Sequence, residues 1–305
     1  MGILRQNCFG CQALVKPSSL FTIFAIFAWF ILSTGMVIAN DEDDKSYDKP
    51  LYDIDPRDFS NSTNIDNKWW PMKPGTEKIY KGHTIEDGEE IPHAVIWTVT
   101  DLTKLIYGIR VVVIWERDIK DGRLEESELT FFAQDDKGNI WHLGQHREIF
   151  DEIELLGFRT WIVGHQEGTK AGIMMKADPE EGWESYSQGY APPPFNWTDR
   201  AQTHKIGEKV KTSYGSFEDV LVVAESSDEE PGAFQLKYYA PGVGVISVGY
   251  LGEDPNKETL ELVETKMLSP QEMAEARSEA LKIEERAYIY GTTLPAMPAP
   301  MSGSE

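Results

Sequence analysis

Hydrophobic and polar positions divide the chain into a continuous apolar block, a long alternating region and a short helical segment. Residues 20–39 contain no charged side chain, and as a helix they would span about 30 Å of hydrocarbon. Arg5 and Lys16 precede this block, and the acidic residues 41–44 follow it. Because basic flanks stay in the cytoplasm, this charge asymmetry predicts export of everything after residue 40.

The apolar block has two interpretations. Val37-Ile38-Ala39 loosely matches the small-residue spacing of a signal-peptidase site, whereas the length of the block exceeds that of a cleaved core. Residues 1–39 are therefore either a cleaved signal peptide, which gives a secreted protein, or a transmembrane anchor that holds the body outside the cell membrane. Cys8 and Cys11, the only cysteines, lie before the block. The exported part is therefore expected to fold without disulfides, and a single C-x-x-C supplies too few ligands for a structural zinc ion.

Alternation of apolar and polar residues dominates residues 61–267 and predicts an antiparallel β domain. The pattern is clearest in four consecutive segments that we expect to form a meander, with a turn at Asp121-Gly122. These segments are residues 91–100, 104–116, 124–134 and 139–144. In the second of them, alternate residues from Leu105 through Tyr107 to Trp115 share one face. Further strands are expected at residues 198–206, 208–213, 219–224, 233–240, 243–251 and 259–266, with shorter pieces at 157–163, 172–176 and 183–190.

The flanking segments lack this alternation. Residues 40–60 are acidic and poor in apolar side chains, which indicates a tether. Ser269-Pro270-Gln271-Glu272 forms a capping box and predicts a helix over 268–289, while residues 290–305 have the composition of a disordered tail. The predicted fold is mainly β, a single curved antiparallel sheet or open half barrel with a C-terminal helix, preceded by an N-terminal transmembrane or signal helix.

The net charge of the chain limits the classes of molecule that it can bind. The formal net charge is −22, and removal of the two basic residues in the leader makes that of the body about −24. Because phosphate binding requires a basic surface, nucleic acid is excluded as a partner. The partners that remain are an apolar small molecule or a protein of the cell envelope, with membrane association through the N-terminal helix.

Four segments resemble an uncharacterised exported bacterial and archaeal β-rich family. They are IDNKWWPMKPGT at residues 65–76, FAQDDKGNIW at 132–141, YGSFEDVLV at 214–222 and KYYAPGVGV at 237–245. The last two also resemble exported half-barrel proteins of the lipoprotein-carrier type, in which a curved sheet encloses apolar cargo or a helix. The resemblance implies an exported curved sheet over roughly residues 60–265, and it implies no activity. Turn chemistry at Pro74-Gly75 and Pro241-Gly242 explains much of these motifs structurally.

Few residues of the sequence are candidates for a catalytic or metal-binding role. His142 and His146 would share one face of a continuing strand about 13 Å apart, too far to bind one metal ion unless the chain turns at Gly144. Asp53, Asp55 and Asp58 offer carboxylates at short spacing, but the segment lacks the glycine and glutamate of a calcium loop. No nucleotide-binding, zinc-protease or serine-hydrolase motif occurs. We therefore assign no catalytic, cofactor or metal residue.

Two sequons, at Asn61 and Asn196, lie in the exported part and are candidate glycosylation sites. The leading expectation is a non-enzymatic protein that binds an apolar or amphipathic ligand in its concavity or acts as an envelope interaction module. Its warrant is the set of aromatic residues on strands expected to face the core: Trp97, Tyr107, Trp115 and Phe131. The alternative is a hydrolase acting on envelope glycans or lipids. Several carboxylates, or a histidine with a carboxylate, in one cleft would favour the hydrolase, and an uncharged apolar cavity would favour the binder.

Overall fold

A computed structural model describes residues 50–151, 153–182, 184–287 and 296–298. The predicted leader at 1–39, Cys8, Cys11 and almost all of the predicted tail lie outside these described residues. Within the described ranges, no helix is both long enough and apolar enough to cross a membrane.

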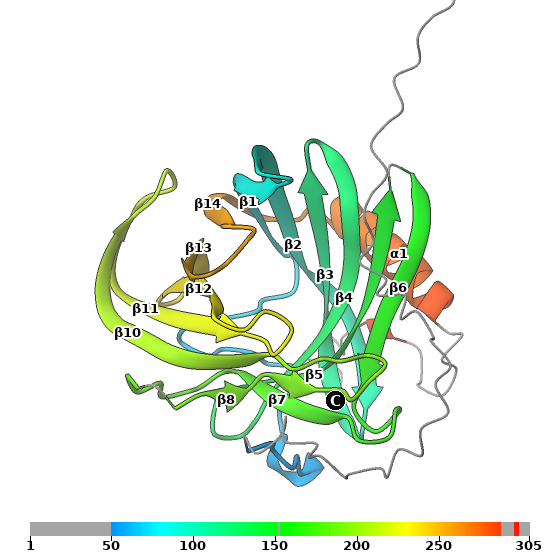
Figure 1. Ribbon diagram of the computed structural model, residues 1–305. Coiled ribbons are helices and arrows are strands. Elements are labelled where there is room, and N and C mark those ends of the chain that lie inside the picture. Colours follow the sequence, from blue (N-terminus) through cyan, green and yellow to red (C-terminus); the bar gives the residue numbers. More distant parts are fainter. Residues whose placement is uncertain (1–49, 152, 183, 288–295, 299–305) are drawn as a thin grey trace, which may run out of the picture. The chain divides into compact units, whose positions relative to one another are not determined.

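Antiparallel strands make up more than half of the described chain (Figure 1). The strands of its first half are β1 (Thr76–Glu86), β2 (Glu89–Ile106), β3 (Ile109–Lys120), β4 (Arg123–Gln134), β5 (Ile140–Asp151), β6 (Glu154–Ile162) and β7 (Lys170–Met175). Those of the second half are β8 (Tyr186–Ser187), β9 (Gly189–Tyr190), β10 (Arg200–Lys211), β11 (Ser216–Ser226), β12 (Ala233–Ala240), β13 (Gly244–Gly252), β14 (Thr259–Met267) and β15 (Met297–Pro298). The helices are the short 3₁₀ turn η2 (Pro56–Asp58) and α1 (Pro270–Ala287).

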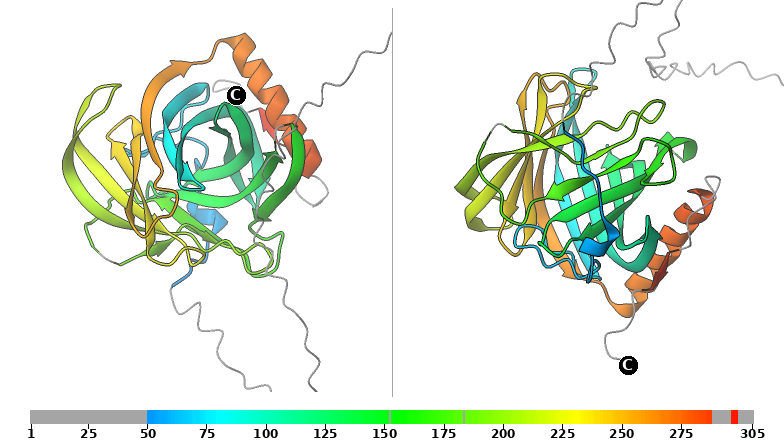
Figure 2. Two further views of the ribbon diagram at one scale, coloured as in Figure 1. Left: turned by 45° about the horizontal axis from the view of Figure 1, so that its top comes forward. Right: turned by 90° about the horizontal axis from the view of Figure 1, so that it is seen from below.

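All strands join one sheet that curls back on itself. Its order is β8-β10-β11-β12-β13-β14-β1-β2-β3-β4-β5-β7-β9, with β6 paired to β5 and β15 to β2. The two ends of this order, β8 and β9, are separated along the chain only by Gln188. Residues 186–190 therefore carry both ends of the sheet, which is nearly closed into a barrel. Figure 2 shows the two arms, β10–β14 and β1–β5, curving toward each other.

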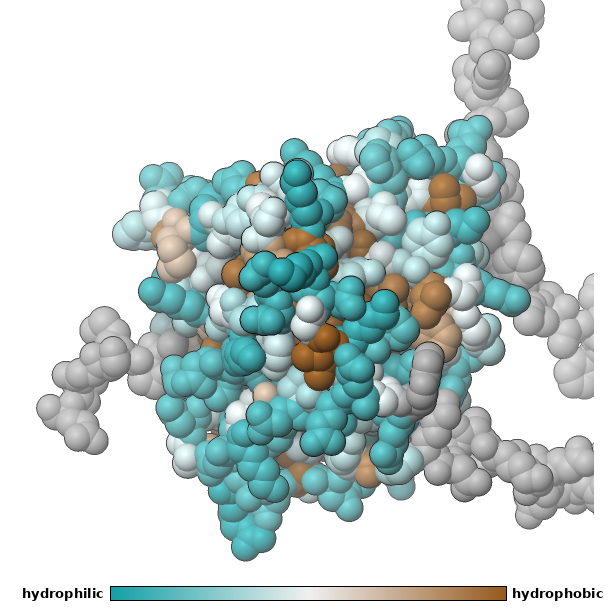
Figure 3. All heavy atoms as spheres, turned by 90° about the vertical axis from the view of Figure 1, so that its left-hand side faces the viewer, coloured by the Kyte–Doolittle hydropathy of each residue, from teal (hydrophilic) through white to brown (hydrophobic). Residues whose placement is uncertain are grey.

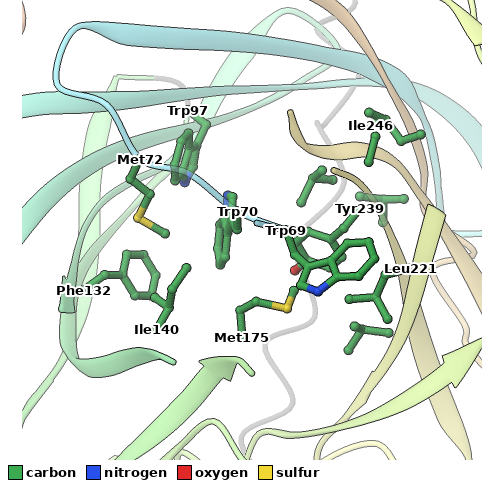
Figure 4. Packing of buried hydrophobic residues seen from close by; sticks show 14 of the residues in the cluster. Trp69, Trp70, Met72, Trp97, Phe132, Ile140, Met175, Leu221, Tyr239 and Ile246 are labelled. Carbon is green, nitrogen blue, oxygen red and sulfur yellow. The ribbon is translucent and has the colours of Figure 1, made fainter. Parts of the chain in front are cut away.

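Apolar residues pack on both faces of the sheet. The inner cluster lies between the two arms, where the loop before β1 places Trp69, Trp70 and Met72 against β2, β4 and β11 (Figure 4). The outer cluster lies on the other face of β2–β5, where α1 contributes Ala280 and Ile283. The face that carries β10 and β11 is largely hydrophilic, with hydrophobic side chains scattered over it (Figure 3).

The predicted capping box begins α1 as expected. The backbone N–H of Ser269 donates to Glu272 Oε2 at 2.8 Å, and that of Glu272 donates to Ser269 Oγ at 3.3 Å. Arg277 and Arg286 then join the helix to the sheet through ion pairs with Asp101 and Glu148. The helix therefore covers the outer face of the sheet rather than the space between the arms.

The predicted meander forms, but the strand expected over 104–116 is wrong. The chain reverses at Tyr107 and Gly108, which have φ values of 51° and 80°, and β2 extends to Ile106. Tyr107 consequently has 54 % of its side chain exposed, and it does not face the core. Tyrosine carries a Cβ and seldom adopts positive φ, so its bulk and β propensity concealed the turn.

Three other segments differ from the prediction. Strand β1 was not predicted, because Lys78, Lys81 and Gly82 interrupt its apolar alternation. The two segments expected at 198–206 and 208–213 form one strand, β10, whose pairing with β11 shifts register around Gly207. Residues 50–60, which we expected to belong to the tether, include Tyr52, Ile54 and Phe59, all of which pack against the outer cluster.

Candidate functional site

A cavity of about 340 Å³ lies on the inner face of the sheet, lined by residues from both arms. On β3, β4 and β5, the lining follows two adjacent cross-strand rows. Thr130 and Gln145 form one row, and Glu116, Glu128 and Arg147 form the next. Since alternate residues of a strand share a face, the inner surface changes from uncharged to charged along the strands.

Aromatic rings close the apolar end of the cavity. Trp70 stacks on Trp97 with 5.6 Å between ring centroids, and it contacts Phe132 at 5.5 Å. The ring of His142 lies 5.2 Å from that of Phe132 and 5.7 Å from that of Trp197. These rings offer a large apolar surface whose faces carry partial negative charge.

The wall above the rings is strongly acidic. Seven of the described lining residues are carboxylates, whereas Arg147 and Lys237 are the lining residues with permanent positive charge. The carboxylates are Glu116, Asp118, Glu126, Glu128, Asp199, Glu225 and Glu258. A second hollow of about 210 Å³ shares four lining residues with the cavity and therefore adjoins it. Five carboxylates and no lysine or arginine are found among the described residues that line this second hollow.

Several of these carboxylates have partners. Arg147 lies 3.1 Å from Glu126 and 3.5 Å from Glu128, and Lys237 Nζ lies 2.6 Å from Glu225. Although burial opposes its charge, the attraction of Glu225 raises the pKa of Lys237 above its ordinary value. This amine therefore remains protonated at neutral pH.

His93 forms ion pairs with two more carboxylates. Its Nε2 lies 2.8 Å from Asp118 and its Nδ1 lies 3.0 Å from Glu258. Burial disfavours the charged ring, but the hydrogen bonds to both carboxylates outweigh this effect and raise the pKa of His93 to about 9. The imidazolium thus links β2, β3 and the end of the second arm next to the cavity.

Glu116 and Asp199 remain without such partners. Within the described part of the chain, neither carboxylate forms a side-chain hydrogen bond or an ion pair. Burial raises the pKa of Asp199 to about 7, with a further contribution from the charge of Glu225. Burial likewise raises the pKa of Glu116 and of Glu128, its neighbour across β3 and β4. The charge of Glu116 adds to the shift at Glu128, and the charges of Asp118 and Glu126 add to the shift at Glu116.

Four buried polar atoms of the lining residues lack a hydrogen-bond partner among the described residues. They are Nε2 of His142, which is 2 % exposed, Oγ1 of Thr130, which is 6 % exposed, Nε of Arg147 and Nε1 of Trp197. Nδ1 of His142 lies 3.2 Å from the carbonyl oxygen of Gln188, so this nitrogen donates. Burial lowers the pKa of His142 to about 4, so the ring is neutral and Nε2 presents an acceptor lone pair.

The structure separates the two histidines considered from sequence. Strand β5 continues through Gly144, and only His142 lines the cavity. His146 instead contacts Thr160 Oγ1 and packs against Phe158. Among the described residues, no three histidine, cysteine or acidic side chains are placed to hold a metal ion.

The other candidates lie away from the cavity. Asp55 caps η2 and binds Arg57, while Asp53 pairs with Lys170 at 2.7 Å. Asn61 is exposed, and the Asn196 side-chain amide donates to Glu229 at 2.9 Å. Glycosylation of either asparagine stays a prediction.

Sequence reasoning missed every carboxylate of the cavity. One signal was present, because the inner face of β3 runs Ile114, Glu116, Asp118 and that of β4 runs Glu126, Glu128, Thr130. In a hairpin that turns at Asp121-Gly122, these acidic ends meet on the same face. Asp199 and Glu225 gave no comparable signal, because they reach the cavity from the other arm.

Comparisons with known proteins add a weak likeness of fold. No protein-family model matches the chain, and no curated protein matches it. A "putative exported protein with YmcC-like fold" from Bacteroides fragilis is 13 % identical with a TM-score of 0.37, and the match covers 66 % of this chain and 99 % of that one. A "putative lipoprotein" from Parabacteroides distasonis is 12 % identical with a TM-score of 0.35, and the match covers 66 % of this chain and 100 % of that one. These scores establish neither a shared family nor a shared function.

Proposed function

We propose that the β domain is an extracytoplasmic binding module that holds a small amphipathic ligand in the cavity between its arms. The apolar block before it supports the location, whether that block is cleaved or retained. The observation that carries the proposal is the cavity itself, which joins stacked aromatic rings to a wall of polar and charged groups. Its volume falls within the usual range for small-molecule sites.

The charged wall revises the ligand expected from sequence. A purely apolar molecule would leave Glu116, Asp199 and His142 desolvated without partners, and such buried polar groups are costly. The ligand therefore combines an apolar part, for contact with Trp70 and Trp97, with a polar part that forms hydrogen bonds.

Native mass spectrometry of the full chain tests this proposal. The protein is released from its host envelope in mild detergent, and a reproducible extra mass that disappears on organic extraction is expected. Val95→Trp, which places a large ring in the cavity, is expected to remove that mass. Val263→Trp is the matched control, because Val263 is half-buried and does not line the cavity. A bare mass for the unsubstituted chain, or the same bound mass in Val95→Trp, would contradict the proposal.

The cavity also meets the condition that the sequence analysis set for a hydrolase, several carboxylates and a histidine in one cleft, so a hydrolase is the second candidate. Glu116 and Glu128 are direct cross-strand partners, a placement that brings Cβ atoms within about 5.5 Å. Burial favours a proton on this pair, and a glycoside hydrolase needs one protonated and one ionised carboxylate. Release of reducing sugar from envelope glycans by the full chain, abolished in Glu128→Gln, would support this candidate. No release at any pH between 5 and 8 would remove it.

A further inference from the structure

The charge of the cavity specifies its ligand more narrowly. We propose that this ligand is a small organic cation, an amine attached to an apolar or aromatic group, with Glu116 and Asp199 as its counter-ions. The inference rests on the proposed function, since it requires the cavity to be a binding site. It adds the chemical class of the ligand and the residues that select it.

The lining of the cavity and its neighbours carry an excess of negative charge. Arg147, Lys237 and His93 form ion pairs with Glu126, Glu128, Glu225, Asp118 and Glu258, so that three positive groups face five carboxylates. Glu116 and Asp199, one from each arm, add to this excess, and both line the cavity without an ion pair of their own among the described residues. A cation placed between the arms would pair with Glu116 and Asp199, whereas these carboxylates would repel an anion.

His142 supports the same class of ligand independently of the carboxylates. His142 is buried and lines the same cavity, and its Nε2 carries a lone pair without a donor among the described residues. A ligand that donates a hydrogen bond would satisfy this nitrogen. An ammonium group has three N–H donors and no acceptor, which suits a site that offers two carboxylates and an imidazole acceptor.

The aromatic rings of the cavity indicate the chemistry of the rest of the ligand. A metal ion is disfavoured, because no described group of three side chains is placed to hold one. The stacked Trp70 and Trp97, with Phe132 beside them, instead offer apolar contact and aromatic faces that attract cations. An organic cation with an apolar part satisfies the acidic wall and the aromatic rings together.

The test compares three probes of nearly equal size on the full chain in nonionic detergent. They are 2-phenylethylamine, 2-phenylethanol and phenylacetate, and binding is followed by calorimetry with a micelle-only blank. The amine is expected to bind about tenfold or more tightly than the alcohol, since charge-assisted hydrogen bonds are the stronger kind. Phenylacetate is expected to show no binding.

Single variants then assign the counter-ions. Glu116→Gln and Asp199→Asn are each expected to weaken amine binding about fivefold or more and to weaken alcohol binding less, because only the amine carries a charge. Glu264→Gln removes the same charge from an exposed position of β14 and is expected to change neither. Thermal unfolding of each variant confirms that it is folded.

The possible failures are distinguishable. Equal binding of amine, alcohol and carboxylate would overturn the cation inference and leave the binding module intact. Amine binding that is unaffected by Glu116→Gln, by Asp199→Asn and by the double variant would overturn the assignment of the counter-ions. Absence of binding for all three probes would overturn the inference, and native mass spectrometry would separately decide whether the cavity holds any ligand.

Discussion

At the scale of single residues, His93 shows how one side chain holds the two arms together. Its ring is 5 % exposed and contacts carboxylates that belong to β3 and to the segment before β14. The pKa of about 9 means that the folded protein binds a proton here which the unfolded chain releases more readily. This stabilisation is fully present below the unfolded pKa of about 6.5 and is lost as the pH rises through 9.

His93→Gln is therefore expected to destabilise the protein in a pH-dependent manner. The pKa change corresponds to about 3 kcal/mol, so the variant should lower the free energy of unfolding by about that amount at pH 6. At pH 9.5, the difference between the two proteins should fall below about 1 kcal/mol. Urea unfolding at the two pH values measures both quantities. The same difference at pH 6 and pH 9.5 would show that His93 is not held as an imidazolium.

At the scale of elements, closure of the sheet depends on close approach of β7 and the β8–β9 segment. A Cβ atom added to Gly172 would lie 1.9 Å from the backbone nitrogen of Gly189, a distance no real contact allows. The same segment supplies Gln188, whose carbonyl receives the His142 hydrogen bond and whose amide donates to Glu225 at 2.7 Å. Closure of the sheet and formation of the cavity are therefore coupled.

Gly172→Ala is expected to affect stability and binding together. Overpacking of backbone against backbone should cost about 1–3 kcal/mol or more, and it should abolish binding of 2-phenylethylamine at temperatures where the variant is still folded. Gly157→Ala is the matched control, because its added Cβ has nothing within 4 Å. Thermal unfolding and calorimetry on the two variants provide the comparison. Unchanged binding in a destabilised Gly172→Ala would separate closure from the cavity.

The elements also show what a single sequence could predict. Strong alternation and the Asp121-Gly122 turn made the β2–β5 meander predictable, and the capping box made α1 predictable. Strand β1 was not predicted, because its buried positions include Lys78. This lysine donates to the Val243 carbonyl, and its Nζ lies 5.6 Å from the centre of the Trp97 ring. A lysine with such partners is acceptable in the core, but periodicity counts it as a polar interruption.

At the scale of the whole molecule, the site could not be predicted because its residues meet only when the sheet curls. Glu116 and Asp199 lie far apart in sequence and on different arms of the sheet. Alternation places each residue on a face, but it does not give the curvature that brings two faces together. For this reason the fold class was predictable, whereas the acidic cavity was not.

The cavity carboxylates predict how stability varies with pH. Glu116, Glu128 and Asp199 have pKa values raised by burial, so the folded protein binds more protons than the unfolded chain once the pH exceeds about 4.5. Their stabilising contribution is present below that pH and is lost as the pH rises through about 7. Scanning calorimetry should therefore give a higher Tm at pH 5.5 than at pH 8.

The double variant Glu116→Gln, Asp199→Asn checks the origin of this pH dependence. Removing two of the three groups should flatten the change in Tm between pH 5.5 and pH 8, whereas Glu264→Gln should leave it unchanged. A Tm that rises across this interval in the unsubstituted chain would contradict the burial of these charges.

The most direct test of the account is a crystal structure of the full chain with 2-phenylethylamine at a concentration near its measured Kd. We expect density in the cavity, with the ring against Trp70 and Trp97 and the ammonium within about 3 Å of Glu116 or Asp199. A cavity that remains without ligand, or an amine bound only on the outer surface, would contradict this expectation.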